Sequence, residues 1–182
     1  MVDSSSSFAT IPLTKLANQV EMNTKANKYS LFFDKTGNCE VFFRYKATLV
    51  EVYKLSLGIT MGQSADDAIE QMRKSLVYCM KSGDNLVLFC DKIAPDFKTK
   101  MTHKENFPAD KIFNFAEWRK KENYKSVLRG DEDQDVFGNK GWYEQKDTFA
   151  ITVLASYTDE EHVQAVLAAL PNAGDFEKFI VQ

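Results

Sequence analysis

The stretch Ser64–Asp91, SADDAIEQMRKSLVYCMKSGDNLVLFCD, decides the fold class. Its first part predicts a helix, because Ser64 can cap the amino end, two aspartates follow in the first turn, and apolar residues recur at three- and four-residue steps. Gly83 is typical of the residue that ends a helix. The run Leu86–Cys90 behind it is continuously apolar, as in a strand that is buried on both faces. A helix that leads into such a strand is the repeating unit of a parallel α/β sheet.

The last third of the chain contains a second pair of such elements, with the strand before the helix. Thr148–Ala155, TFAITVLA, predicts a second strand that is buried on both faces. A helix should follow it, with Thr158 as its cap and Pro171 as its end. Near the amino terminus, apolar residues at helical spacing predict a helix that begins near Leu13 and fades before Asn27. We therefore predict a three-layer α/β domain with a mainly parallel central sheet and helices on both faces.

Other segments have less decisive patterns. Tyr29–Asp34, YSLFFD, predicts a strand, and a hairpin is expected because the turn KTGN and a second apolar run, CEVFFRY, come next. Leu49–Leu57 fits a strand or a short helix. Asn114, with a glutamate three positions later, predicts the start of a helix over FAEWRKKENYKSVL. Residues 129–147 predict a long loop, and Phe176–Val181 predicts a short edge strand.

Length and composition indicate one ordinary globular domain. The chain has 182 residues, of which 44% are hydrophobic and 27% charged, which excludes collagen-like, low-complexity and wholly disordered classes. The serine tract Ser4–Ser7 predicts a disordered tail over residues 1–10. Residues 11–182 are expected to form a single α/β domain.

The charge and the cysteines indicate a cytoplasmic location. A net charge of -3 lacks the positive field that drives non-specific nucleic-acid binding. An acidic residue stands near the amino terminus where a signal peptide is basic, and no apolar run approaches the ~20 residues that cross a bilayer. Cys39, Cys79 and Cys90 form no C-x-x-C pair and suit reduced, buried thiols, and they have no recognisable zinc-site spacing with His103 and His162. No membrane partner is therefore expected.

Three predicted strands end in small polar or acidic residues, namely Asp34, Asp91 and Ser156. Ligands of open α/β sheets bind beyond the carboxyl ends of the strands, so these residues are candidates for one crevice. LVLFCD also has the form of a Walker B strand, whose final aspartate holds Mg²⁺. Asp34, Asp91 and Ser156 are thus the candidate site for a Mg-nucleotide. The plainer interpretation is that they are polar residues at the points where core strands emerge into solvent.

The phosphate loop that would strengthen this hypothesis, G-x-x-x-x-G-K-[ST], is missing. Gly37 lacks both the second glycine and the Lys-Ser/Thr pair. Gly62, Gln63 and Ser64 precede a predicted helix start and are a candidate anion site. The aspartates that follow Ser64 already interact with the helix dipole and would repel phosphate.

An acidic loop offers a candidate calcium site at Asp133, Asp135 and Glu144. These residues fall at positions one, three and twelve of an EF-hand loop, with glycine at position six. Phe137, however, occupies position five, where an oxygen ligand is needed, so a solvated loop is the default interpretation. His103 and His162 have no nucleophile context, and no catalytic residues are predicted.

The stretch from Leu57 to Phe97 resembles the final AAA+ module of dynein heavy chains, with matches at Gly62-Gln63, Ala65, Gly83, Leu86–Leu88 and Ala94. With LFFDKTGNCEVFFRYK ahead of it and TFAITVLASY behind it, the chain is similar over residues 28–181 to the carboxy-terminal region of proteins that combine an IQ motif with ankyrin repeats. The resemblance implies a P-loop-NTPase-like α/β scaffold without Walker A and without nucleotide hydrolysis. It also implies a cytoskeletal or ciliary setting.

These observations lead to three functional hypotheses. The first is a non-catalytic protein-interaction or scaffold module that binds a protein partner, cytoskeletal in the setting that the resemblance implies, and needs no cofactor. The alternative is a divergent nucleotide-binding protein or NTPase that uses Asp91 as a Walker B-like acid. The third is a single-stranded nucleic-acid binder that uses residues 98–125, where eight Lys/Arg face four Asp/Glu (+4). Residues 129–147 hold three against six (-3), so charge is segregated along the chain.

Overall fold

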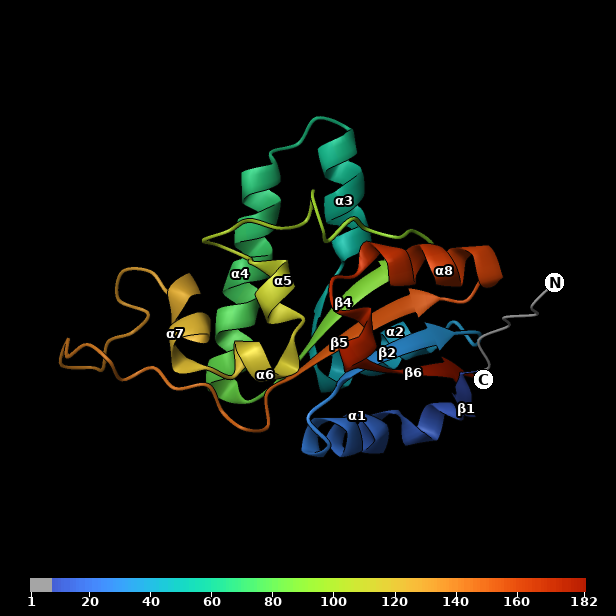
Figure 1. The fold of residues 1–182 in the computed structure, drawn as a ribbon, viewed down its shortest axis with the longest axis horizontal. Coiled ribbons are helices and arrows are strands. Elements are labelled where there is room, and N and C mark those ends of the chain that lie inside the picture. The colour runs from blue at the N-terminus through green and yellow to red at the C-terminus, as the bar shows by residue number, and fades with distance from the viewer. Residues whose placement is uncertain (1–7) are drawn as a thin grey trace.

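A six-stranded sheet lies at the centre of the computed structural model, which describes residues 8–182 (Figure 1). All neighbouring strands are parallel, in the order β1-β6-β2-β5-β4-β3. The strands are β1 (Ala9–Ile11), β2 (Tyr29–Asp34), β3 (Thr48–Val50), β4 (Asn85–Asp91), β5 (Ala150–Ser156) and β6 (Phe176–Val181). The sheet confirms the predicted α/β class.

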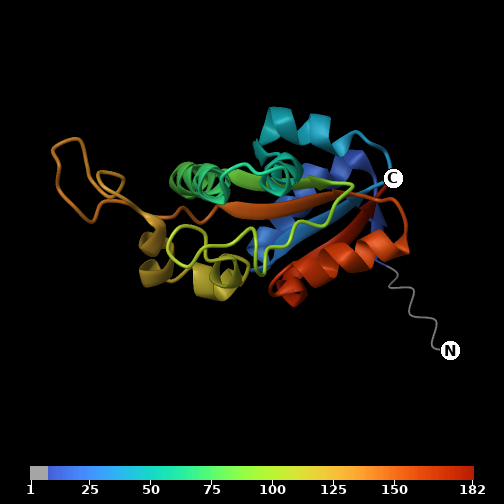
Figure 2. The ribbon, with the colours of Figure 1, turned by 90° about the horizontal axis from the view of Figure 1, so that it is seen from above.

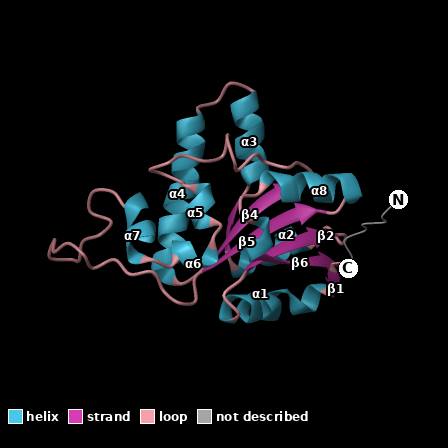
Figure 3. Cartoon of the chain, in the orientation of Figure 1, coloured by secondary structure: helices cyan, strands magenta, loops and turns pink. Residues whose placement is uncertain are grey.

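Helices cover both faces of the sheet (Figure 3). They are α1 (Leu16–Lys25), α2 (Cys39–Lys46), α3 (Val52–Thr60), α4 (Ala65–Ser82), α5 (Ala109–Ile112), α6 (Phe115–Trp118), α7 (Lys121–Tyr124) and α8 (Glu160–Ala169). On one face α1 and α2 pack against Phe32, Val87 and Leu154. On the other face α4, α5, α6, α7 and α8 enclose the larger core, around Leu31, Leu88 and Val153. The three-layer prediction is therefore confirmed.

The helix predicted from Ser64 is α4, and its details match the prediction. The Ser64 side chain accepts a hydrogen bond from the Asp67 backbone N–H, and Gly83 ends the helix in the left-handed conformation. The buried strand predicted at Leu86–Cys90 is β4, and the second buried strand is β5. The residues that face the core in α4 follow the predicted stripe, which includes Met72 and Leu76. The ambiguous segment Leu49–Leu57 contains the end of β3 and the start of α3.

The predicted hairpin after Tyr29–Asp34 is wrong, because Cys39–Lys46 is helix α2. Its aromatic and β-branched residues favoured a strand, but its spacing is helical. Cys39 and Phe43 are both buried, four positions apart, and Glu40 and Arg44 form an ion pair at the same spacing. A parallel sheet also requires a crossover rather than a hairpin after β2.

Four further features differ from the predictions made from the sequence. The helix predicted from Asn114 is broken into α6, α7 and a 3-10 turn, because Lys120 is extended between α6 and α7. Asp159, rather than Thr158, caps α8. β6 is an inner strand, because β1 pairs outside it. β1 begins at Ala9, inside the tail predicted for residues 1–10, and Ser4–Ser7 lie outside the described residues.

None of the helices from residue 8 onward has the length and apolarity to cross a bilayer.

Gly83 supplies a direct test of the junction between α4 and β4. Its φ is 77°, and a Cβ at this position would meet the side chains of Thr148 and Lys146. We expect Gly83→Ala to lower the free energy of unfolding in urea by about 2 kcal/mol or more, because the left-handed conformation alone costs roughly 1–2 kcal/mol. Gly141→Ala is the matched control, since Gly141 has a φ of 89° but no atom within 4 Å of its Cβ position. Equal losses in the two variants would contradict the steric part of this prediction.

Candidate functional site

The carboxyl ends of β2, β5 and β4 bring the three predicted strand-end residues to one edge of the sheet. Asp34 and Ser156 are register partners on adjacent strands. The Ser156 hydroxyl donates a hydrogen bond of 3.0 Å to Oδ1 of Asp91. The helix that follows β2 covers one face and the helix that follows β5 covers the other. Adjacent strands whose helices lie on opposite faces define the position at which open α/β sheets bind ligands.

The Asp34 carboxylate fills the turn between β2 and α2. Its Oδ1 accepts hydrogen bonds from the backbone N–H of Thr36 at 2.8 Å and from the Thr36 hydroxyl at 2.7 Å. Its Oδ2 accepts from the backbone N–H of Cys39, the first residue of α2, at 2.9 Å. The Thr36 hydroxyl in turn accepts from the backbone N–H of Asn38 at 3.0 Å. Three N–H groups at this helix start are therefore already bonded to side chains.

This arrangement is unfavourable for phosphate. Phosphate binds at such turns through backbone N–H groups at the amino end of the following helix. In this chain those groups hold a carboxylate that is only 8% exposed. A phosphate would have to displace Asp34 and then lie beside its negative charge. This role of Asp34 was not predicted from the sequence. An aspartate two residues before Thr36 is nevertheless typical of a side chain that accepts hydrogen bonds from the backbone of a turn.

Asp91 has a different environment at the same edge. Its φ is 52°, and a β-bulge separates it from Phe89 in the pairing with β5. A non-glycine residue in this conformation stores strain, which is common at functional sites. On the β2 side, the Lys35 ammonium lies 4.2 Å from the centre of the Tyr157 ring, and the Tyr157 N–H donates to the Asp34 carbonyl. This edge of the sheet thus contains the positive charge of Lys35 and the carboxylates of Asp34 and Asp91. Each of the two carboxylates is hydrogen-bonded within the protein.

The candidate anion residues, Gly62, Gln63 and Ser64, lie at the start of α4 and not at the end of a strand. The Ser64 hydroxyl oxygen accepts a hydrogen bond of 3.2 Å from the Asp67 backbone N–H. The Gln63 backbone N–H donates to the Gly58 carbonyl of α3, and Gly62 has a φ of 91°. The geometry is that of a capped helix that is joined to α3 by a tight turn.

The candidate calcium ligands do not form one group. Asp133 forms an ion pair of 2.9 Å with Lys125 and accepts the Tyr143 N–H. Asp135 accepts hydrogen bonds from the backbone of the loop between α7 and β5. Glu144 lies exposed beyond Tyr143. In the part of the chain that the structure covers, no three His, Cys, Asp or Glu side chains are arranged to hold a metal ion.

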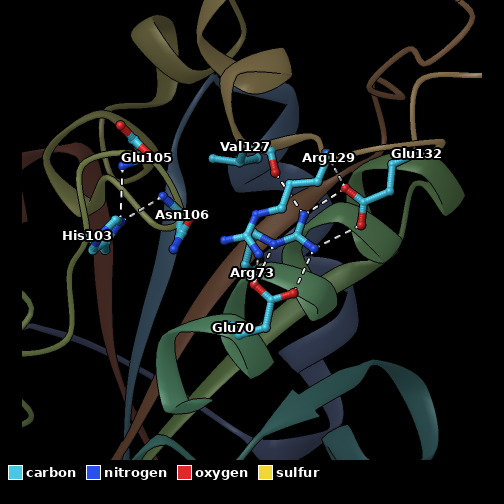
Figure 4. Close-up of polar contacts among 8 residues, drawn as sticks. All are labelled: Glu70, Arg73, His103, Glu105, Asn106, Val127, Arg129 and Glu132. Carbon is cyan, nitrogen blue, oxygen red and sulfur yellow. Dashed lines mark hydrogen bonds and ion pairs between the residues drawn. The ribbon is translucent and has the colours of Figure 1, made fainter. Parts of the chain in front are cut away.

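A buried arginine holds the base of this loop (Figure 4). Arg73 of α4 is 2% exposed and donates hydrogen bonds to both carboxylate oxygens of Glu70 and of Glu132. It also donates to the Val127 carbonyl at 2.8 Å. Its hydrogen-bonding capacity is therefore used within the protein, and Glu132 is fixed to α4. This role of Arg73 could not be predicted from the sequence, because Arg73 lies on the stripe of α4 that packs on the core.

The histidines and cysteines show no nucleophilic arrangement. His103 accepts hydrogen bonds through Nδ1 from the backbone N–H groups of Glu105 and Asn106, which closes a local turn (Figure 4). Cys39, Cys79 and Cys90 are free and buried, as predicted. Burial raises the pKa of all three thiols, so little thiolate forms at neutral pH.

Comparison with known proteins adds no relative. No protein-family model, curated protein or solved structure matches the chain. The candidate site therefore rests on its own geometry.

Asp34 can be tested by its effect on stability. We expect Asp34→Ala to lower the free energy of unfolding by about 1–3 kcal/mol, because it removes an acceptor that bonds two backbone N–H groups at the start of α2. Ser156→Ala removes one hydrogen bond at the same edge and is the control. Urea unfolding of both variants gives the comparison. A loss in Asp34→Ala no larger than that in Ser156→Ala would show that the carboxylate does not hold the turn.

The Arg73 cluster predicts a dependence of stability on pH. Hydrogen bonds from Arg73 lower the pKa of Glu70. Burial raises the pKa of Glu132, but the hydrogen bonds and charge of Arg73 together with the Arg129 backbone N–H outweigh burial and lower it. As the pH falls below the ordinary glutamate range, the unfolded chain therefore takes up protons before the folded one, and this stabilisation is lost. We expect Glu132→Gln to be less stable than the wild type at pH 7, with the difference shrinking towards pH 3. A constant difference in urea unfolding across this range would contradict the assignment.

Proposed function

We propose that this chain is a non-catalytic protein-interaction or scaffold domain. The observation that supports it best is the Asp34 carboxylate, which accepts the N–H groups of Thr36 and Cys39 at the position where a parallel sheet of this kind would bind phosphate. A domain whose ligand position is filled by its own side chain acts through its surface instead.

The proposal includes a degenerate, P-loop-like fold and a cytoskeletal or ciliary setting. Both are supported by the resemblance to dynein modules and to IQ-motif and ankyrin-repeat proteins. The turn that follows β2 is short: α2 begins five residues after Asp34. A Walker A loop needs eight residues, G-x-x-x-x-G-K-[ST], with a lysine that reaches the phosphates. The proposed scaffold is thus one in which this loop is replaced by a short, self-capped turn.

The alternative is a divergent nucleotide-binding protein that uses Asp91. One observation favours it, namely the left-handed conformation of Asp91 beside the Ser156 hydroxyl at the ligand end of the sheet. Mg²⁺ is usually held by one or two carboxylates together with substrate phosphates. This alternative therefore still needs a phosphate site away from the Asp34 turn.

Thermal unfolding with Mg-ATP, Mg-GTP and their diphosphates at millimolar concentration separates the two functions. We expect no shift in Tm with any of them. A ligand at ~100 times its Kd would add about 2.7 kcal/mol, which moves Tm by several degrees in a domain of this size. A shift that is present in the wild type and lost in Asp91→Ala would overturn the non-catalytic proposal in favour of the nucleotide-binding alternative. A shift that Asp91→Ala retains would indicate nucleotide binding elsewhere and would also overturn it.

A further inference from the structure

A groove lies at the amino ends of β4 and β5, at the opposite end of the sheet from the candidate nucleotide site. Its volume is about 700 Å³, within the ~300–1,000 Å³ range of sites that hold small molecules. The loop between α7 and β5, in orange, projects away from the sheet (Figure 2), and of this loop only Asp147 and Thr148 line the groove. The apolar part of the lining comes from α1, α6 and β5, through Ala17, Val20, Phe115 and Ala150.

The charges that line the groove balance one another. Glu21 and Lys25 of α1 form an ion pair of 2.6 Å. The other two charged residues are Arg119 and Asp147, one positive and one negative. A charged ligand would therefore lose its hydration on entry without meeting an excess of opposite charge. This lining favours an uncharged ligand.

Arg119 is held in a fixed position at the wall of the groove. Its terminal nitrogens Nη1 and Nη2 donate hydrogen bonds to the backbone carbonyls of Lys146 and Phe149. Its guanidinium carbon lies 4.7 Å from the centre of the Phe115 ring and 5.6 Å from that of the Phe149 ring. A guanidinium group has five N–H groups, and the buried Nε–H of Arg119 has no partner among residues 8–182. One further N–H on each terminal nitrogen can therefore donate to a ligand.

Asp147 supplies an acceptor close to these donors. Arg119 is bonded to the carbonyl of Lys146, the residue directly before Asp147. Burial lowers the pKa of Arg119, and the charges of Tyr29 and Asp147 act against this effect. The Asp147 carboxylate forms no hydrogen bond and no ion pair with the part of the chain that the structure describes. The groove thus contains a free donor and a free acceptor next to an apolar surface.

A carboxamide group matches this pair. Its carbonyl oxygen accepts a hydrogen bond and its N–H donates one, although the group has no net charge. Both hydrogen bonds would be made to an ionised side chain, and such bonds are stronger than those between neutral groups. An apolar body attached to the amide would bury its surface against Val20, Phe115 and Ala150.

We propose that this groove binds a small uncharged molecule with an apolar body and a carboxamide group, whose carbonyl accepts from Arg119 and whose N–H donates to Asp147. This goes beyond the proposed function. It does not involve the carboxyl edge of the sheet, so the outcome of the nucleotide experiments leaves it unaffected.

Titration with 3-phenylpropanamide, followed through the backbone amide signals in ¹H–¹⁵N NMR spectra, tests the proposal. We expect saturable shifts at Ala17, Val20 and Ala150, with a Kd of about 0.1–10 mM for a compound of this size. 3-Phenylpropanoate and 3-phenylpropylamine have a similar body with a negative or a positive charge, and N,N-dimethyl-3-phenylpropanamide lacks the N–H. Each of these three should bind about tenfold more weakly or worse, because each is charged or leaves Asp147 without a donor.

Two pairs of variants locate the site. Ala17→Phe fills the groove and should abolish binding, whereas Asn18→Phe, at the next exposed position of α1, lies outside the lining and should bind like the wild type. Asp147→Ala should remove the preference for the primary amide over its dimethyl derivative. Glu144→Ala, which removes an exposed acid of the same loop outside the groove, should retain that preference.

A wild type that shows no saturable shifts with 3-phenylpropanamide would overturn the proposal. Binding that persists in Ala17→Phe would place the ligand elsewhere and would overturn it as well. Equal affinities for the amide and the acid would contradict the uncharged ligand. A preference for the primary amide that Asp147→Ala retains would contradict the role of Asp147.

Discussion

Burial of the central strands on both faces is the constraint on which the rest of the structure depends. β2, β4 and β5 contain no exposed residue, so each must be covered above and below. That requirement places α1 and α2 on one face and the larger group of helices on the other. It also makes every strand parallel, because each connection must pass over a face of the sheet instead of turning back at its edge.

The same constraint explains why the polar chemistry lies at the ends of the strands. Carboxylates, which are costly to bury inside the sheet, lie where a strand emerges and can reach partners there. Asp34 reaches backbone N–H groups of the next helix, and Asp91 reaches Ser156 across the sheet. Both acids are therefore hydrogen-bonded within the chain, and this is the observation on which the proposal of an interaction domain rests.

The sequence predicted those features that depend on local pattern. The limits of α4, the buried strands β4 and β5, and the meeting of Asp34, Asp91 and Ser156 all follow from apolar periodicity and from the parallel sheet. The helix at Cys39–Lys46 was missed because its aromatic residues suit both states and tertiary packing decided between them. The Arg73 cluster could not be predicted, since Val127 and Glu132 are distant in sequence from Arg73 and meet it only in the folded chain.

The strand order has a consequence for how the chain is made. β2 is synthesised well before its two neighbours in the sheet, β5 and β6. Until those strands leave the ribosome, YSLFFD is an apolar strand with neither edge paired, and such segments are prone to aggregate. The strand order therefore leaves β2 with both edges unpaired during synthesis until β5 and β6 have emerged, so the centre of the sheet is among the last parts of the fold to form.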